Sequence, residues 1–279
     1  MRQAQRNTPP LGTPVGPDRK CVAHFTTHHT RPALYGRHAA ATTWEDPLRI
    51  TDLVFPALRY SLGTGMRAAF RPQVQGKENI PTTGAAIIAS NHLAFLDSFF
   101  LPLVSPRAIH FLAKAEYFNG KGIKGRAMAG FFTGVGAIPV DRAGGRAAIA
   151  ALNAGLDVLK DGELFGIYPE GTRSPDGRLY KGRTGVAHLA LQTGVPVIPA
   201  CVVDTNKVQP DKDKPLRLRP VKVTIKFGEP LDFSKYQDMP SNRHVIRAIT
   251  DEVVDAIRAL SGQEYVDRYA STPAPLTKK

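Results

Sequence analysis

From residue 76 onward, short apolar runs alternate along the chain with segments whose apolar residues recur every three or four positions. Apolar runs that are rich in β-branched residues and bounded by turn residues are typical of buried strands. We expect six strands, at residues 85–89, 109–113, 134–140, 164–168, 195–203 and 221–227. Because these runs are almost continuously apolar and helical segments separate them, they predict an α/β fold with a largely parallel sheet that is covered by helices.

Three of the intervening segments have the apolar spacing of a helical face. Helices are predicted over residues 145–160, which end at an Asp-Gly pair, and over residues 185–192. The clearest helix is predicted at 241–260, where apolar residues from Val245 to Ile257 lie on one side and Ser241 is placed to cap the amino-terminal end.

Residues 48–70 form a separate amphipathic segment that precedes the sheet. Their apolar positions recur at three- and four-residue steps, as on one face of a helix, and arginines flank this stripe. Pro56 and the pair Gly63 and Gly65 are expected to bend or split the helix. Two interpretations stay open, a helix that packs on the core and an interfacial helix whose apolar stripe enters lipid.

The first 44 residues are rich in Pro, Thr, Arg and His, contain Asp18 as their only acid and show no apolar periodicity. We therefore expect a disordered basic tail. An organellar transit peptide is also rich in arginine and poor in acids, but the amphipathic spacing of such a peptide is missing. The predicted organisation is a tail at 1–44, a membrane-associating helical segment at 45–75, an α/β domain at 76–262 and a second tail at 263–279.

The 279-residue chain has a formal charge of +13 and a pI near 9.9, which favours an anionic partner. No nucleic-acid motif accompanies this charge, so an anionic membrane surface is preferred over nucleic acid. No apolar run is long enough to span a membrane, and the first ten residues lack the apolar core of a secretory signal. Cys21 and Cys201 indicate a reducing compartment without disulfides. These features predict a protein bound peripherally to the cytoplasmic face of a membrane, with no spanning helix.

Polar residues follow the strand predicted at 85–89, where His92 and Asp97 stand five positions apart. An imidazole titrates near neutrality and can take a proton from a hydroxyl, while a carboxylate on its other nitrogen fixes the tautomer. Because a Gly-x-Ser-x-Gly motif is absent, direct attack by a substrate hydroxyl is favoured over a covalent acyl-enzyme. The alternative is a histidine that only caps or packs the end of a strand.

A second polar group follows the strand predicted at 164–168. Glycine at 171 lets the backbone approach a ligand, so the N–H groups of Gly171 and Thr172 and the guanidinium of Arg173 are suited to a phosphate. Glu170, which precedes them, either binds the hydroxyl groups of an acceptor or pairs with an arginine. The sequence therefore predicts a phosphate site beside a proton acceptor.

Two further cations, Lys114 and Arg142, end other predicted strands and are candidates to bind the same phosphate. Isolated surface cations are the commoner explanation for each of them. We expect no metal site, and no Walker loop is present.

Four blocks of this sequence resemble, in order and rough spacing, those of the glycerolipid acyltransferases, and most of all the 1-acylglycerol-3-phosphate acyltransferase type. They are Asn-His-x4-Asp at 91–97, Gly-x-Ile-Pro-Val-x-Arg at 136–142, Pro-Glu-Gly-Thr-Arg-Ser at 169–174 and Val-Pro-Val-Ile-Pro at 195–199. The resemblance implies that His92 is the general base and Asp97 its orienting partner. It also implies that Arg142 and residues 171–173 hold the phosphate of the acceptor, with Glu170 nearby.

The same resemblance implies the substrates. The donor is expected to be acyl-CoA or acyl carrier protein, the acceptor lysophosphatidic acid and the product phosphatidic acid, with no further cofactor. Glycerol-3-phosphate, another lysophospholipid or a glycolipid precursor are alternative acceptors. A membrane lipid-binding protein without catalysis is the alternative of another class, and the presence of His92, Asp97 and Arg173 together argues against it.

Overall fold

The structure, a computed structural model, describes residues 47–140, 147–208 and 221–270. The tail predicted at 1–44, most of the tail predicted at 263–279 and Arg142 lie outside the described residues.

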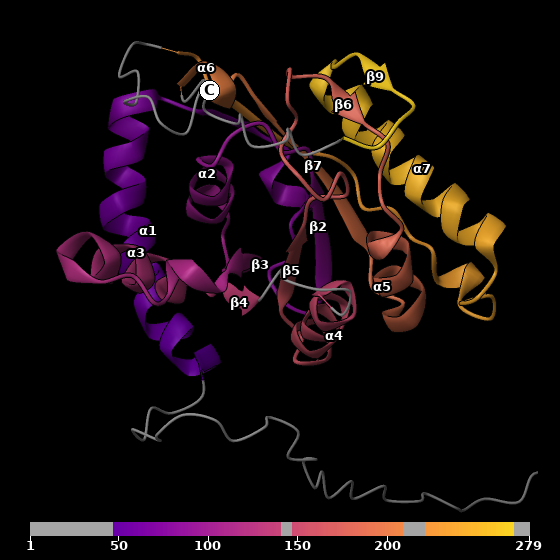
Figure 1. Ribbon diagram of the computed structural model, residues 1–279, viewed down its shortest axis with the longest axis horizontal. Coiled ribbons are helices and arrows are strands. Elements are labelled where there is room, and N and C mark those ends of the chain that lie inside the picture. Colours follow the sequence, from indigo (N-terminus) through magenta and orange to yellow (C-terminus); the bar gives the residue numbers. More distant parts are fainter. Residues whose placement is uncertain (1–46, 141–146, 209–220, 271–279) are drawn as a thin grey trace, which may run out of the picture. The chain divides into compact units, whose positions relative to one another are not determined.

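A seven-stranded sheet forms the centre of the described part of the chain (Figure 1). Its strands follow the spatial order β1-β8-β7-β2-β5-β3-β4, and all neighbours are parallel except β7 and β8. The predicted α/β fold with a largely parallel sheet is confirmed. The strands are β1 Gln73–Gln75, β2 Ala86–Ser90, β3 Ile109–Lys114, β4 Ile138–Val140, β5 Leu164–Ile167, β7 Val197–Val203 and β8 Thr224–Phe227.

A second, two-stranded sheet pairs β6 Leu179–Tyr180 with β9 Tyr265–Val266 in parallel. Strand β6 follows β5 in the chain, whereas β9 follows the last helix, so this small sheet joins two distant parts of the sequence. It lies beside the edge of the large sheet at which β2 and β5 end (Figure 1).

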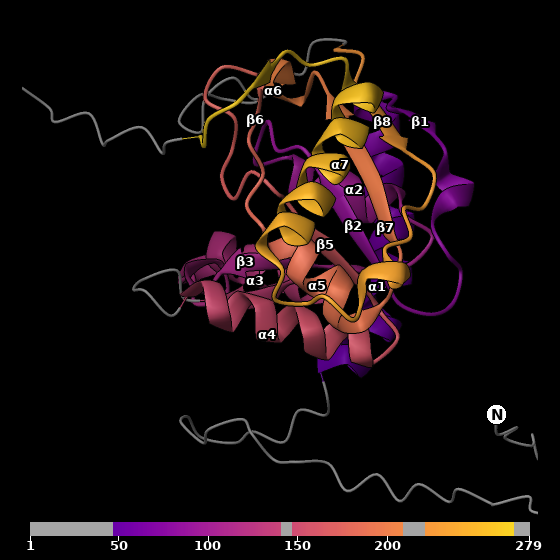
Figure 2. The same ribbon diagram turned by 90° about the vertical axis from the view of Figure 1, so that its right-hand side faces the viewer.

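Helices cover both faces of the large sheet (Figures 1 and 2). One face carries α1 Pro47–Phe70, α2 Asp97–Val104 and α3 Gly122–Gly134; the other carries α4 Ala147–Lys160, α5 Gly185–Thr193 and α7 Arg243–Ser261. The remaining elements are α6 Thr205–Val208 and the 3₁₀ turns η1 Lys77–Asn79, η2 Ala115–Tyr117 and η3 Ser234–Tyr236.

The central strand β2 shows how the two layers are held. Successive side chains of a strand point to opposite faces, so Ile88 packs with Phe100 and Phe131 on one side, whereas Ile87 packs with Leu189 and Val253 on the other. All five residues of β2 are buried. Its near-continuous apolar sequence is therefore explained by burial on both faces.

Helix α1 differs from the prediction, because it runs unbroken from Pro47 to Phe70 through Pro56. The split expected at Pro56 or at the Gly63 and Gly65 pair does not occur, since α1 packs along α2 and α3. Met66 belongs to the core, and Leu58 packs at Gly134 of α3, where an added Cβ would collide with it. Part of the predicted apolar stripe is thus used for core packing. None of the described helices is long and apolar enough to cross a membrane.

Several predicted boundaries differ from the structure, and the strand expected at 221–227 begins only at Thr224. The strand expected at 134–140 is limited to Ile138–Val140, because Gly134 still belongs to α3. The cap of α7 is Asn242 and not Ser241, since the Asn242 Oδ1 accepts hydrogen bonds from the N–H groups of His244 at 3.0 Å and Val245 at 3.3 Å.

Candidate active site

The candidate residues gather at one edge of the large sheet because the strands that precede them are parallel neighbours. Strand β2 ends just before His92, β5 ends just before the loop with Glu170 and Arg173, and β3 ends with Lys114. Ligand sites of open α/β sheets form at this carboxyl edge of the strands. The structure thus brings together the residues predicted from separate segments, while Arg142 lies outside the described residues.

His92 and Asp97 form a hydrogen-bonded pair, with 2.9 Å between Nδ1 and Oδ2. Asp97 is the first residue of α2 and is fully buried, whereas the His92 side chain is 15% exposed. The same Oδ2 accepts the backbone N–H groups of Leu93 at 2.7 Å and Ala94 at 2.8 Å, so the turn into α2 folds the carboxylate back toward the ring. An Nδ1–H that donates to Asp97 leaves Nε2 as the basic nitrogen.

Tyr168 fixes the plane of the His92 ring, a role that the sequence prediction missed. The two rings are stacked, with centroids 4.0 Å apart and planes within 10°. Tyr168 in turn stacks on Phe111 of β3 at 5.0 Å, and burial raises the pKa of the Tyr168 hydroxyl. The sequence offered one sign of this contact, an aromatic residue directly after β5, the strand that pairs with β2.

Glu170 is buried, with 1% of its surface exposed. Its Oε1 accepts the His92 backbone N–H at 3.2 Å and its Oε2 accepts the Tyr180 backbone N–H at 2.9 Å. Burial raises the pKa of this carboxyl to about 7 despite these hydrogen bonds. Glu170 therefore ties the two polar loops together through the backbone of His92, and its predicted contact with an acceptor stays a prediction.

Asn91 and Ser174 hold the backbone of His92 from two other directions. The Asn91 amide pairs with the backbone of Val202 in β7, at 2.8 and 3.0 Å, and donates to Gln263 Oε1 at 2.7 Å. The Ser174 N–H donates to the His92 carbonyl at 2.7 Å. Both residues stand within the motifs described above, but the sequence assigns them no role. Asn91 contacts residues that are distant in the chain, and Ser174 contacts the His92 backbone.

The loop at 171–173, which was predicted to bind a phosphate, differs from the expectation in one backbone N–H group. Gly171 has a φ of +72°, and its N–H donates to the Tyr168 carbonyl at 2.9 Å instead of being free for a ligand. Residues with a side chain are strained at such a positive φ, which explains the glycine. Arg173 is exposed, and no residue in the described ranges forms an ion pair or hydrogen bond with its guanidinium.

Lys114, the last residue of β3, is likewise exposed. Thr172, Arg173 and Lys114 therefore supply polar and cationic groups at the edge of the sheet where the hydrogen-bonded pair of His92 and Asp97 lies. Such an edge can bind an anion and take a proton from a neighbouring hydroxyl.

Comparison with known proteins assigns the chain to a family. Residues 71–203 match the family model described as Acyltransferase. The 1-acyl-sn-glycerol-3-phosphate acyltransferase of Bacillus subtilis is 30% identical over 193 residues, which cover 68% of this chain and 88% of the relative. The enzyme of the same name from Limnanthes alba is 33% identical over 161 residues, or 57% of this chain and 54% of the relative. The chain thus spans about half the length of this plant relative.

The fold also has a counterpart among solved structures. The crystal structure of the 1-acyl-sn-glycerophosphate (LPA) acyltransferase PlsC from Thermotoga maritima superposes with a TM-score of 0.55 and 28% sequence identity. The match covers 78% of this chain and 84% of the other.

Proposed function

The chain belongs to the acyltransferase family that includes the 1-acyl-sn-glycerol-3-phosphate acyltransferases, and on this premise we propose that it acylates 1-acylglycerol-3-phosphate. The donor is an acyl thioester of coenzyme A or acyl carrier protein, and the product is phosphatidic acid. The observation that carries the proposal is the pair of His92 and Asp97 at the carboxyl edge of the sheet, where Arg173 has no ion-pair partner among the described residues.

In the proposed reaction, His92 Nε2 takes the proton of the free glycerol hydroxyl as its oxygen attacks the thioester carbonyl carbon. A carbon–oxygen bond forms, the tetrahedral intermediate collapses with loss of the carbon–sulfur bond, and the proton passes from His92 to the leaving thiolate. Asp97 accepts the Nδ1–H of His92 and stabilises the imidazolium, while two backbone N–H groups hold its Oδ2 in place.

The phosphate of the acceptor is proposed to lie against Arg173, Thr172 and Lys114, with Arg142 as a further candidate. A guanidinium can bind a phosphate through two charge-assisted hydrogen bonds, which makes Arg173 the main contact. Such binding places the substrate without taking part in the proton transfer. Its loss should therefore weaken binding of phosphorylated acceptors in particular.

Arg173→Ala is expected to raise the KM for lysophosphatidic acid about tenfold or more, since charge-assisted hydrogen bonds contribute on the order of 1.5–3 kcal/mol. The KM for monoacylglycerol, which lacks the phosphate, should not change. Steady-state kinetics in detergent micelles measure both values, with Arg126→Ala, an exposed arginine of α3, as the matched control. An equal loss with both acceptors would rule out a phosphate contact for Arg173.

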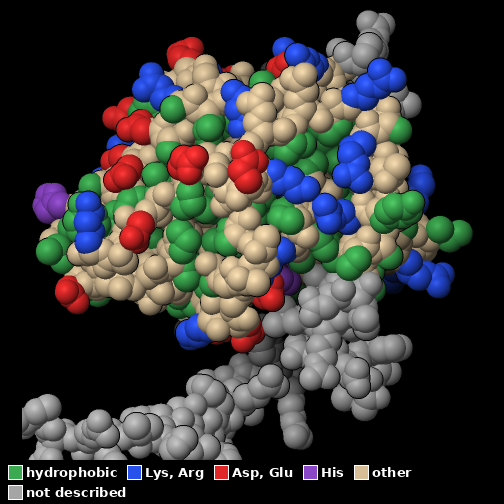
Figure 3. Space-filling view, turned by 180° about the vertical axis from the view of Figure 1, so that it is seen from behind, with side chains coloured by type: hydrophobic (Ala, Val, Ile, Leu, Met, Phe, Trp, Pro, Cys, Tyr) green, Lys and Arg blue, Asp and Glu red, His purple; other side chains and the backbone are tan. Residues whose placement is uncertain are grey.

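The proposed acceptor is a membrane lipid, and we extend the proposal to peripheral binding of an anionic membrane through α1. Arg59 and Arg67 stand eight residues apart on one side of this helix, and Arg67 folds back toward Gly63 between them. Burial, together with the charges of Arg59 and Arg67, lowers the pKa of Lys77. Basic side chains gather on the half of the molecule where α1 lies (Figure 3).

The double variant Arg67→Gln, Lys77→Gln is expected to bind vesicles with anionic lipid about tenfold or more weakly, since each cation near such a surface contributes about 1 kcal/mol. Sedimentation with phosphatidylcholine vesicles, with and without phosphatidylserine, measures this change. The control, Lys160→Gln with Lys235→Gln, removes the same charge from α4 and η3. Equal weakening by the control would show that α1 is not the contact.

A further inference from the structure

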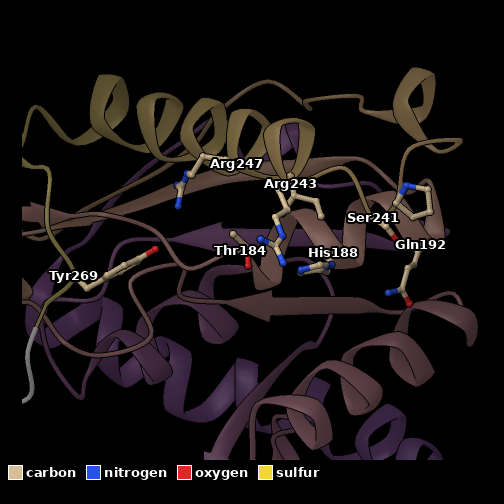
Figure 4. Close-up of a pocket in the computed structure, with 9 residues that line it drawn as sticks. Thr184, His188, Gln192, Ser241, Arg243, Arg247 and Tyr269 are labelled. Atoms are coloured by element: carbon tan, nitrogen blue, oxygen red, sulfur yellow. The ribbon is translucent and has the colours of Figure 1, made fainter.

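A groove of about 610 Å³ lies between α5 and α7, on the face of the sheet opposite α1 (Figure 4). None of the sequence-predicted site residues lines it. Helix α5 contributes His188 and Gln192 and is preceded by Thr184, while α7 contributes Arg243 and Arg247, and Tyr269 lies at the other end from Gln192. Thr184 and Gln192 are eight residues apart, so the α5 wall is about 12 Å long.

The charge of this groove is positive. No acidic residue is among those that line it. Arg247 is already engaged, because it pairs with Asp251 and donates to the Gly182 carbonyl at 2.9 Å. Arg243 is exposed, and none of the described residues offers it an ion pair or a hydrogen bond. In Figure 4 its guanidinium extends toward Thr184 and His188, so it points into the groove.

The stability of α7 does not explain Arg243. A cation in the first turn of a helix opposes the helix dipole, and the first turn of α7 contains no acid that would offset it. Asn242 already caps the helix. An arginine that weakens its own helix, points into a cavity and lacks a partner is suited to an anionic ligand.

The groove begins close to the candidate active site. Thr184, which lines the groove, directly follows Arg183. The Arg183 backbone N–H donates to the Pro169 carbonyl at 2.7 Å, and the Arg183 side chain lies against Gly171. Arg183 also contacts the ring of Tyr269, with its guanidinium carbon 5.2 Å from the ring centroid. A ligand in the groove would thus reach the loop that carries Gly171 and Arg173.

We propose that this groove binds the phosphate-bearing part of coenzyme A, with Arg243 and His188 contacting its phosphates. The inference rests on the proposed function for the thioester donor and adds where that donor is held. The groove has the volume of a small-molecule site, which fits a free coenzyme better than a carrier protein. The donor would reach His92 past Arg183, while the phosphorylated acceptor approaches Arg173.

The test uses the full chain and two variants of the same helix. Arg243→Ala removes the proposed phosphate contact and should not unfold α7, since it takes a cation away from the helix amino terminus. Arg258→Ala is the control, because Arg258 is exposed near the other end of α7 and contacts the ring of Tyr265. Isothermal titration calorimetry measures the Kd for coenzyme A and, separately, for inorganic phosphate.

Arg243→Ala is expected to raise the Kd for coenzyme A about tenfold or more, with Arg258→Ala unchanged. The KM for palmitoyl-CoA should rise with it, while the KM for the palmitoyl thioester of N-acetylcysteamine, which has no phosphate, should stay constant. Coenzyme A binding that survives Arg243→Ala, or that falls equally in Arg258→Ala, overturns the proposal. Inorganic phosphate that binds as tightly as coenzyme A also overturns it.

Binding and turnover separate this inference from the proposed function. If coenzyme A binds through Arg243 but no acyl group reaches lysophosphatidic acid, the groove is supported and the proposed function fails. If acyl transfer from palmitoyl-CoA proceeds with the same KM in Arg243→Ala, the function is supported and the groove is not the donor site.

Discussion

Replacing His92 with alanine is expected to lower acyl transfer by about 10²- to 10⁴-fold, the range that a positioned general base contributes. The substitution removes the nitrogen that would take the hydroxyl proton. Asp97 keeps its two backbone hydrogen bonds, so the turn into α2 should hold. Single-turnover formation of phosphatidic acid from labelled acyl-CoA measures the rate, and circular dichroism checks the fold.

The control for this variant is His244→Ala, which removes an exposed histidine in the first turn of α7. Its rate should equal that of the unaltered protein. A His92→Ala protein that is folded and fully active would refute the role of His92. If the His92→Ala protein does not fold, the same assay is run with His92→Gln, whose side chain is also polar.

The second large effect is expected for Asp97→Asn. Its amide oxygen can still accept the N–H groups of Leu93 and Ala94, but the negative charge that stabilises an imidazolium is lost. We expect turnover to fall by about two orders of magnitude or more. The amide NH₂ would take the place of Oδ1, which is buried and has no hydrogen-bond partner in the structure. Because a buried NH₂ group without an acceptor is costly, the free energy of unfolding should fall by about 1–3 kcal/mol.

Urea unfolding and turnover are measured together for this variant, so that the two losses can be separated. Asp157→Asn, an exposed aspartate of α4, removes the same charge from the surface and should change neither quantity. If turnover falls only in proportion to the unfolded fraction, Asp97 stabilises the fold and has no part in the chemistry.

The sheet was predictable because its inner strands are buried on both faces. Strand β2 and its neighbours β5 and β7 therefore appear as continuous apolar runs, and α7 has a strongly one-sided apolar pattern. Helix α3 was not predicted, since its sequence contains four glycines and a weak apolar face. Strands β1, β6 and β9 have only two or three residues, too few for a periodic signal.

The site was predictable only as far as it is local. Five positions separate His92 from Asp97, and a turn that enters a helix can close that distance. The contact of Glu170 with the His92 backbone spans 78 positions, and the stacking of Tyr168 on His92 depends on the pairing of β2 with β5. Such contacts follow from sheet order, which spacing along the chain does not contain.

The same reason hides the groove with Arg243. Its two walls, α5 and α7, are each visible in the sequence, but their separation depends on how both helices pack on β7 and β2. From the sequence alone, Arg243 was one of many surface cations on a basic chain.

The measurement that tests the proposed function most directly is thiol release from palmitoyl-CoA by the purified protein, with and without lysophosphatidic acid, for the unaltered chain and His92→Ala. We expect release that requires both the acceptor and His92, accompanied by an equal amount of phosphatidic acid. Release that needs His92 but proceeds equally without the acceptor would identify a thioesterase and contradict acyl transfer. Absence of release from both proteins, with acyl-CoA and with acyl carrier protein, would contradict catalysis by this chain.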